Sequence, residues 1–494
     1  KNHPSGIFWF HPHVHGLSLN QVSEGMAGLI TIGNPDDYLG DEPGSYGLHG
    51  RVVVRNLLLK DIEVEKSNEV ADQEDPDFCD PEPPSSSPVR PGYCNGVKIA
   101  SPEGTTDHVG GKWIFSVSGQ VFPSATIKDK GEIWRLASGS GSRGYALALR
   151  DDDTGELLPF QVLAIDGVSI DAPARGDTSH FAATLGDRIT QAPCPGNPVP
   201  SALSRPVCAT VLRMMPSARS EIFVPSHIGP SRHASFITQS LVTGPDGDSW
   251  PSVGLIRVSF AGHPDGYATA LEVRPTSRDL LRTGGLLASP AKISLPGMRD
   301  AMDVKEAAHL PQFAAHTSSL TDSSCKALPA GHTRRIFFGV PTGEPDGFGL
   351  GYEELDQHGK PVPGTFKDVE PFDHLSITVC LPLADDNKPV TERWELVNVA
   401  GEDHNFHIHQ THFKVLSQNA PAGDGGAIMD NVPVFNGGPS CDGSVATWRS
   451  GGCKVKPVSV EIPFAEIGDF VYHCHILEHE DGGMMAHIRV VAHP

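Results

Sequence analysis

A cysteine flanked by two histidines near the end of the chain is the strongest chemical signal in the sequence. His473, Cys474 and His475 are followed by His479 and Met484. A blue-copper site uses two imidazoles and one thiolate in a trigonal set, with a weak axial methionine. Side chains alternate along a strand, so His473 and His475 would share one face and Cys474 would point to the other. The segment therefore supplies most of a blue-copper site and two further imidazoles.

A second histidine-rich segment supplies the imidazole that the blue-copper site still needs. Its histidines are His404, His407 and His409. Taken alone, either segment is also compatible with a solvent-facing histidine run or an adventitious metal site. Zinc is the chemical competitor. One cysteine and two histidines with a methionine, and several imidazoles to spare, favour copper.

Histidines also gather near the start of the chain, at His11, His13 and His15. A histidine-rich strand end is by itself more often structural or adventitious. Here, however, Phe8–His13 resembles Phe470–His475, and each is followed by a Gly-Met segment and an alternating strand. We therefore expect two equivalent domain ends whose histidines meet in space.

The elements that must position these side chains are short strands. The 494 residues include 53 glycines and 43 prolines, and helical periodicity is weak. A second internal repeat relates Gly131–Leu136 to Thr391–Leu396. We predict an all-β fold of three consecutive related units, with the first cut short at its N-terminus. The expected units are residues 1–45, 46–286 and 287–494.

Several segments show the alternation of strands with one buried face. They are Gly6–His11, Gly28–Gly33, Leu375–Val379, Arg393–Val397 and Val458–Ile462. The acidic, proline- and serine-rich stretch Asp61–Pro91 is expected to be a long excursion from the middle unit. Because Gly6–His11 is a strand without a preceding partner, we expect the chain to be a fragment of a longer protein.

Eight of the nine cysteines can be paired by position, which leaves Cys474 alone. Three pairs bracket short loops and one pair is more widely spaced. The expected disulfides are Cys79–Cys94, Cys194–Cys208, Cys325–Cys380 and Cys441–Cys453. Paired loop cysteines favour an oxidising compartment, and unrelated reduced thiols are the alternative.

Charge and hydropathy exclude several kinds of partner. The formal net charge is −22 at pH 7, and nucleic acids select basic faces, so no nucleic-acid partner is expected. No run approaches the roughly 18 apolar residues of a membrane span. With the expected disulfides and the lack of any N-glycosylation sequon, these features indicate a periplasmic or secreted bacterial protein.

In combination, the three histidine segments resemble a known family. Trp9–Gly16, His404–His409 and His473–Met484 look like three of the four copper motifs of multicopper oxidases, most closely the bacterial laccase-like and copper-resistance members. The resemblance implies three cupredoxin-like Greek-key β-barrel domains, a type 1 copper, and a trinuclear cluster of type 2 and type 3 coppers. The fourth motif, an H-x-H pair, would precede His11, so the type 2 and type 3 ligand set is expected to be incomplete.

The resemblance also implies a role for each ligand. The type 1 copper would be bound by His404, Cys474, His479 and Met484. The type 2 copper would be bound by His407. The type 3 pair would be bound by His11, His13, His409, His473 and His475. His15 and His412 match no ligand position, and Asn405 stands where many relatives have proline.

The implied activity is that of a laccase-like oxidase. A phenol or aromatic amine would give electrons singly to the type 1 copper, Cys474 would provide a short covalent path, and the cluster would reduce O₂ to water. This reduction consumes protons, and Glu480 stands where relatives place an acid, although a solvated loop carboxylate is the alternative. Oxidation of Cu(I), Fe(II) or Mn(II) in metal tolerance is the alternative activity. The eight scattered methionines weaken a copper-detoxification role.

Substrate choice depends on less specific signals. Glu402 and Asp403 precede His404 and could stabilise an oxidised cationic substrate or bind a metal ion, or be turn carboxylates. Three other classes of cupredoxin fit less well. An electron carrier needs only the blue site, a structural cupredoxin would have lost ligands, and copper nitrite reductases lack the paired His473 and His475.

Overall fold

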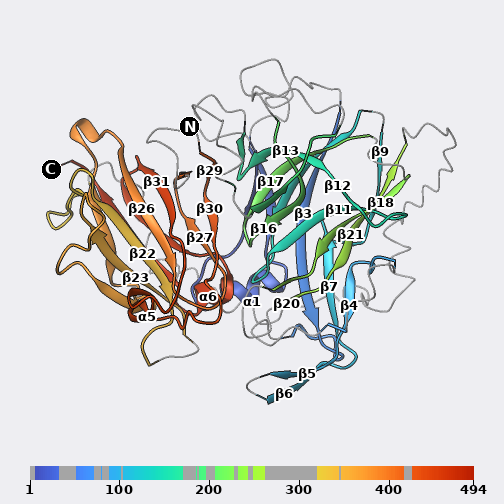
Figure 1. The fold of residues 1–494 in the computed structure, drawn as a ribbon, viewed down its shortest axis with the longest axis horizontal. Coiled ribbons are helices and arrows are strands. Elements are labelled where there is room, and N and C mark those ends of the chain that lie inside the picture. The colour runs from blue at the N-terminus through green and yellow to red at the C-terminus, as the bar shows by residue number, and fades with distance from the viewer. Residues whose placement is uncertain are drawn as a thin grey trace, which may run out of the picture.

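The computed structural model describes residues 6–32, 52–71, 79–80, 88–101, 104–128, 130–170, 185, 188–195, 206–226, 232–242, 249–261, 320–343, 347–416 and 426–493. Within these ranges most regular structure is β-strand, and the helices are short. Figure 1 shows two large β units with helix α1 at their junction. The all-β expectation is confirmed. Among the described residues, no helix has the length and apolar character needed to cross a bilayer.

The first large unit, here the middle unit, is built on one 15-stranded sheet. Its strands are β3 Val53–Val64, β4 Tyr93–Asn95, β7 Lys112–Val117, β8 Gln120–Val121, β9 Ser124–Ile127, β10 Glu132–Ser138, β11 Tyr145–Asp151, β12 Leu157–Leu158, β13 Phe160–Ile165, β14 Val168–Ser169, β15 Ile189–Gln191, β16 Cys208–Met214, β17 Arg219–Val224, β18 His233–Gln239 and β21 Val253–Phe260. Two separate ribbons pair β5 Lys98–Ser101 with β6 Gly104–Asp107, and β19 Leu241–Val242 with β20 Ser249–Trp250.

The C-terminal unit is a sandwich of two sheets. The seven-stranded sheet contains β22 Thr333–Gly339, β23 Gly349–Leu355, β24 Lys367–Glu370, β26 Val390–Asn398, β28 Phe413–Leu416, β29 Ile428–Met429 and β31 Val458–Phe464. The five-stranded sheet contains β25 Ile377–Pro382, β27 His404–Ile408, β30 Asn431–Val434, β32 Gly468–Cys474 and β33 Met485–Val491. The short helices are η4 Asp385–Asn387, α5 Val445–Arg449 and α6 Leu477–Asp481. The buried ring of Trp394 packs on Tyr472 across the sandwich, with 5.3 Å between centroids.

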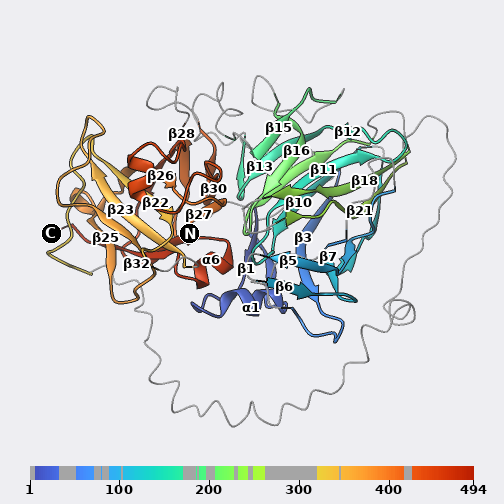
Figure 2. The same cartoon turned by 60° about the horizontal axis from the view of Figure 1, so that its bottom comes forward.

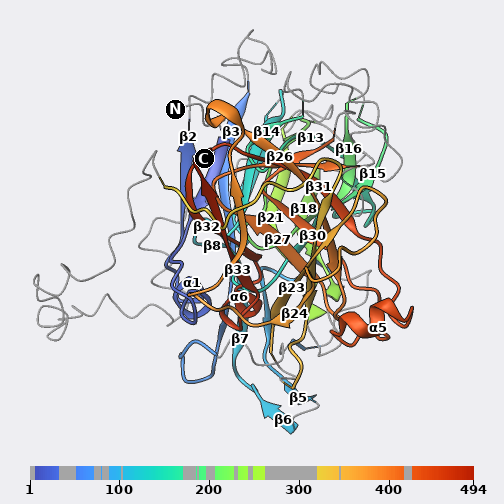
Figure 3. The ribbon, with the colours of Figure 1, turned by 90° about the vertical axis from the view of Figure 1, so that its left-hand side faces the viewer.

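The N-terminal segment bridges the two units. It consists of β1 Gly6–Phe10, helix α1 Ser18–Ser23 and β2 Gly28–Ile32, with β1 and β2 antiparallel. Strand β1 contacts β10 of the middle unit (Figure 2). Helix α1 buries Leu19 and Val22 against Leu477 of α6. Figure 3 shows α6, which connects β32 to β33, close to α1.

The second internal repeat corresponds to one side-chain arrangement built twice. In the middle unit, Trp134 Nε1 donates to Glu132 at 2.9 Å, and the same carboxylate accepts from Arg55 on the parallel strand β3. In the C-terminal unit, the equivalent residues are Trp394, Glu392 and Arg334. The two units therefore share a common plan, as the repeat predicts.

Two expectations about strands were wrong in their limits. The excursion expected over Asp61–Pro91 begins later, because Asp61–Val64 complete β3 with alternating buried and half-buried side chains. The strand expected at Leu375–Val379 lies at Ile377–Pro382, because a turn joins Ser376 N to the Asp373 carbonyl and leaves Leu375 exposed. The predicted unit boundaries at 45/46 and 286/287 lie outside the described residues and stay predictions.

The cysteine pairing is confirmed. The four disulfides are Cys79–Cys94, Cys194–Cys208, Cys325–Cys380 and Cys441–Cys453. Cys474 remains free and is fully buried. A reduced, buried thiol between two histidines has the chemistry of a metal ligand.

Candidate metal centre

Three elements of the C-terminal unit bring together the residues expected at the type 1 site. His404 begins β27, Cys474 ends β32, and His479 lies in α6. Strands β27 and β32 are paired antiparallel, so the two strand ligands meet at the same end of the sheet. Helix α6 follows Cys474 after two residues and turns His479 back toward it.

The three donor atoms converge to within 3.9 Å of one another, with the two sulfur–nitrogen distances close to those of bound ligands and the two nitrogens closer together. His404 Nδ1 and His479 Nδ1 are 2.9 Å apart, and Cys474 Sγ lies 3.9 and 3.6 Å from them. Ligands of one ion, at roughly 2.0–2.3 Å from it, stand about 3.5–3.8 Å apart. All three side chains are buried. The donor set therefore fits a trigonal copper, with no other thiol near it to form a disulfide.

Two neighbours complete the surroundings of this donor set. Met484 is fully buried, and its backbone bonds both Cys474 and His479. Asn405 donates its backbone N–H to Cys474 Sγ at 3.3 Å and its side-chain amide to the Pro216 carbonyl of the middle unit. A proline at this position would have no N–H to donate.

The pKa values of the two histidines of this site are shifted in opposite directions. Burial, helped by the charge of His479, lowers the pKa of His404 to about 3. Burial would also lower the pKa of His479, but the charge of Glu402 and hydrogen bonds that the imidazole donates to Cys474 and Glu402 raise it well above its usual value. Glu402 Oε2 lies 3.5 Å from His479 Nε2.

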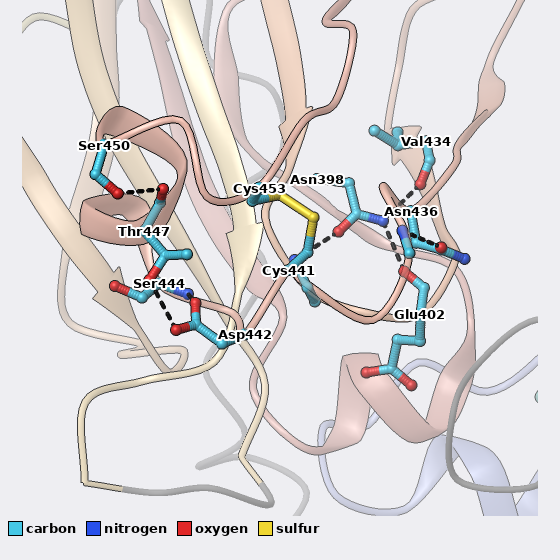
Figure 4. Close-up of a disulfide and its surroundings, with 12 residues drawn as sticks. Asn398, Glu402, Val434, Asn436, Cys441, Asp442, Ser444, Thr447, Ser450 and Cys453 are labelled. Carbon is cyan, nitrogen blue, oxygen red and sulfur yellow. Dashed lines mark hydrogen bonds between the residues drawn. A yellow bond between two sulfur atoms is a disulfide. The ribbon is translucent and has the colours of Figure 1, made fainter.

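The loop before β27 is held in place by side-chain amides beside the Cys441–Cys453 disulfide (Figure 4). Asn398 donates to the backbone oxygen of Glu402 at 2.7 Å. Asn436 donates to the carboxylate of Asp403 at 2.7 Å. Asp403 is therefore used as a turn carboxylate, as one of the two alternatives expected, whereas Glu402 faces the imidazole of His479.

Six further histidines form a second donor set behind the first. They come from the N-terminal segment, from β27 and the residue after it, and from β32 and the residue after it: His11, His13, His407, His409, His473 and His475. The ring centroids of neighbouring members are 4.7–5.6 Å apart. The expectation that the two repeated domain ends meet in space is confirmed.

Within this histidine cluster, two triplets could each hold an ion. One is His13, His409 and His473, whose Nε2 atoms lie 3.3 and 3.2 Å apart around His473. The other is His407, His473 and His475. His11 packs against His475, with 5.0 Å between ring centroids.

Hydrogen bonds on the outer nitrogens fix which nitrogen faces inward. His407 Nδ1 donates to the Asp430 carbonyl, and His11 Nδ1 donates to the Pro12 carbonyl, both at 2.8 Å. A carbonyl only accepts, so each Nε2 keeps its lone pair. Such outer partners set the tautomer of metal-binding histidines.

The carboxylate of Glu480 contacts two histidines of the cluster on their outer nitrogens. Its buried carboxylate lies 2.9 Å from His473 Nδ1 and 3.4 Å from His13 Nδ1. Burial alone would raise the pKa of Glu480, but the charge and hydrogen bond of His473 lower it to about 2. A solvated loop carboxylate, the alternative considered from sequence, is excluded by this burial.

Most imidazoles of the cluster are held in the neutral form that binds metals. Burial lowers the pKa of His407 to about 3 and that of His11 to about 4. The pKa values of His409 and His475 lie well below the usual range for the same reason. Neutral imidazole is the metal-binding form, so the cluster fits a metal centre.

The structure also places the two histidines without an expected ligand role. His15 packs on the ring of Phe372, outside both triplets. His412 Nε2 lies 3.8 Å from Asp430 and 3.3 Å from the Asp166 carbonyl. Sequence reasoning missed Asp430 and its surroundings, because a single aspartate between two short hydrophobic strands has no diagnostic spacing.

Sequence comparisons agree with these donor sets. Residues 378–493 match a family model described as Multicopper oxidase. The multicopper oxidase of Staphylococcus aureus is 36% identical over 105 residues, which are 20% of this chain and 20% of that protein. The laccase of Bacillus subtilis is 32% identical over 100 residues, 19% of each chain. The matches thus span about a fifth of the length of these curated relatives.

Structure comparisons extend over nearly the whole chain. A multicopper oxidase variant from Aquifex aeolicus has a TM-score of 0.52 at 18% identity, over 99% of this chain and 77% of that one. A Campylobacter jejuni multicopper oxidase, described as a metallo-oxidase, has a TM-score of 0.52 at 14% identity, over 99% and 72%. At these identities the likeness concerns the fold, and it confirms a cupredoxin-like β architecture.

The fold and the two donor sets define a copper protein built from cupredoxin-like domains. More specifically, residues 378–493 of the C-terminal unit, which carry most members of both donor sets, match the multicopper oxidase family model. The resemblance noted from the motifs is therefore confirmed.

Proposed function

We propose that the protein is a laccase-like multicopper oxidase, which couples one-electron oxidation of a phenol or aromatic amine to reduction of O₂ to water. One observation carries this proposal. Cys474 belongs to one donor set, while its chain neighbours His473 and His475 belong to the other. The two sets are therefore joined by consecutive residues, which provide a short covalent path for electrons between two metal centres.

The ligand roles follow the two donor sets. His404, Cys474 and His479, with Met484 as the weak axial ligand, would hold type 1 copper. The histidine cluster would hold type 2 and type 3 copper, with His407 at the former and His11, His13, His409, His473 and His475 at the latter. When bound, copper supplies the one-electron chemistry and the reduction of O₂.

Glu402 defines the side from which a reducing substrate would approach. Its carboxylate lies against His479 Nε2 and is partly exposed. A carboxylate here can accept the proton that a phenol or amine loses on oxidation, and it stabilises positive charge on the substrate. The same carboxylate could bind Fe(II), Mn(II) or Cu(I), so metallo-oxidase activity is the second candidate function.

Glu480 is the proposed proton-delivery group and acts as a catalytic residue with Cys474. It is the carboxylate that touches two histidines of the cluster, through Nδ1 of His473 and of His13. This carboxylate is ionised in the resting protein, so it can take up a proton transiently and pass it inward while O₂ is reduced. It also fixes the ring orientation of both histidines.

The first test is a visible and EPR spectrum of the chain after copper loading, with copper counted per protein. We expect an intense blue band and a type 1 EPR signal. The variant Cys474→Ser should lose the blue band and keep its far-UV circular dichroism. An unchanged blue band in this variant would remove the type 1 assignment.

A second test separates the two candidate functions. Turnover of a phenol should exceed turnover of Fe(II) or Cu(I), and Glu402→Gln should lower kcat/KM for the preferred substrate. Faster turnover of a metal ion than of any phenol would favour the metallo-oxidase.

The expected partners are O₂ and a small reducing substrate, without nucleic acid. We propose a periplasmic or secreted bacterial location, supported by four disulfides among the described residues.

A further inference from the structure

A buried group of charges lies where the three parts of the molecule meet. Arg219 and Asp166 belong to the middle unit, Asp430 belongs to the C-terminal unit, and Phe8 belongs to the N-terminal segment. The guanidinium of Arg219 lies over the ring of Phe8, 5.3 Å from its centroid. Arg219 thus contacts β1, which leads to His11 and His13, and also Asp430, which immediately precedes β30, although Arg219 is not a metal ligand.

The contact between Arg219 and Asp430 is a bidentate ion pair. Arg219 Nη1 donates to Asp430 Oδ1 at 2.7 Å, and Nη2 donates to Oδ2 at 2.5 Å. Arg219 is 3% exposed, so water screens this pair weakly. Two parallel hydrogen bonds fix the position and the orientation of a carboxylate.

Asp430 passes this constraint to a proposed copper ligand. Its carbonyl accepts from His407 Nδ1 at 2.8 Å, and its carboxylate lies 4.0 Å from the same nitrogen. The position of the Asp430 main chain therefore decides where His407 Nε2 points. On the other side of the carboxylate, His412 Nε2 lies 3.8 Å from Oδ2.

The middle unit holds Arg219 rigidly. The hairpin between β13 and β14 turns at Asp166 and Gly167, which have φ of 47° and 77°, as Asp-Gly hairpin turns do. Asp166 Oδ1 accepts from Arg219 N at 2.9 Å, and its carbonyl accepts from Nη2 at 3.3 Å. A Cβ on Gly167 would come within 2.6 Å of the Phe8 ring, so glycine lets Phe8 approach the turn.

We propose that Arg219 is a positioning residue for the copper centre: by clamping Asp430 across the unit junction, it orients His407 toward the ion. The inference rests on the proposed function, because it assumes that the histidine cluster holds copper. Loss of an outer partner of a metal ligand typically costs about 10–100-fold in metal affinity.

The test uses copper titration of the full chain, followed by EPR of the non-blue copper, with the blue band as an internal reference. Arg219→Met should weaken non-blue copper binding at least about tenfold and leave the blue band intact. His407→Ala should weaken the same binding, and Arg219→Met should add nothing in that background. Should Arg219→Met fail to fold, Arg219→Lys keeps the charge but not the bidentate geometry.

Arg135→Met is the matched control. Arg135 forms a comparably buried ion pair with Glu221, at 2.8 Å, and both partners belong to the middle unit. It should destabilise the protein without changing non-blue copper affinity. The inference would be overturned by unchanged affinity in Arg219→Met, by additive losses with His407→Ala, or by an equal loss in Arg135→Met.

A wild-type chain that takes up no non-blue copper would contradict the proposed function and not this inference. Crystal structures of the metal-free wild type and Arg219→Met then decide. We expect the His407 ring to leave the Asp430 carbonyl in the variant, and an unmoved ring would overturn the inference.

Discussion

At the residue scale, the immediate neighbours of Cys474 set the environment of its sulfur. Its sulfur accepts a hydrogen bond from the Asn405 backbone at 3.3 Å, and two imidazole nitrogens face it at 3.6 and 3.9 Å. Hydrogen bonds to the cysteine sulfur are among the factors that tune the potential of a blue-copper site. The asparagine in place of proline therefore has a direct electronic consequence.

Asn405→Pro should lower the reduction potential of the type 1 copper. The backbone N–H of Asn405 stabilises electron density on the sulfur and so favours the reduced copper. The substitution removes this N–H, and the reduced state loses that stabilisation. A tenfold effect on the one-electron equilibrium would be about 59 mV, and redox titration of the blue band measures it.

Asn405→Ala is the control, because it keeps the N–H and loses only the side-chain bond to Pro216. Equal shifts in both variants would assign the effect to the unit contact and not to the sulfur.

At the scale of elements, α6 serves three purposes with three consecutive residues. His479 faces Cys474, Glu480 faces His473 and His13, and Asp481 binds the N-terminal segment. The Asp481 carboxylate accepts from Gly16 N at 2.7 Å and from Leu19 N at 2.8 Å. Helix α6 therefore contacts both donor sets and also holds α1 through hydrogen bonds.

Asp481→Ala should lower the free energy of unfolding by about 1 kcal/mol, as expected for loss of a capping acceptor. It should also speed hydrogen exchange of the amides of Gly16 and Leu19, which exchange mass spectrometry can follow. The reason is that both N–H groups lose their acceptor.

Asp442→Ala is the matched control for this prediction. Asp442 accepts from Ser444 N and Thr447 Oγ1 beside α5 (Figure 4). It should leave exchange at α1 unchanged. Equal exchange in the two variants would contradict the assigned role of Asp481.

At the scale of the whole molecule, the histidine cluster lies at the junction, so its protonation state is linked to folding. Burial lowers the pKa of His404 and His407 to about 3 and that of His11 to about 4. In the unfolded chain these groups titrate near 6.5. Below that pH the unfolded state binds protons that the folded state does not bind.

We expect the metal-free protein to lose stability as the pH falls from 6.5 toward 4. The loss is up to about 1.4 kcal/mol per pH unit for each such histidine. His473 and His479 act in the opposite sense only above this window, because their pKa values are raised in the folded state. Urea unfolding across the pH range measures the slope.

Two variants check the origin of this slope. His407→Gln cannot titrate and should reduce it, whereas His233→Gln, at an exposed position, should leave it unchanged. The same slope in all three proteins would attribute acid sensitivity to other groups.

The sequence by itself determined the ligand types, the disulfide pairing and the all-β plan. These features depend on local rules: strand alternation separates Cys474 from its two histidine neighbours, and a repeated motif implies a repeated element. Only the tertiary structure decided which groups contact the proposed ligands and orient them. Arg219 lies 211 residues from Asp430, Glu402 reaches His479 across β27 and α6, and no spacing pattern predicts such contacts. They arise because packing the two units and the N-terminal segment together buries charges that must then find partners across the junction.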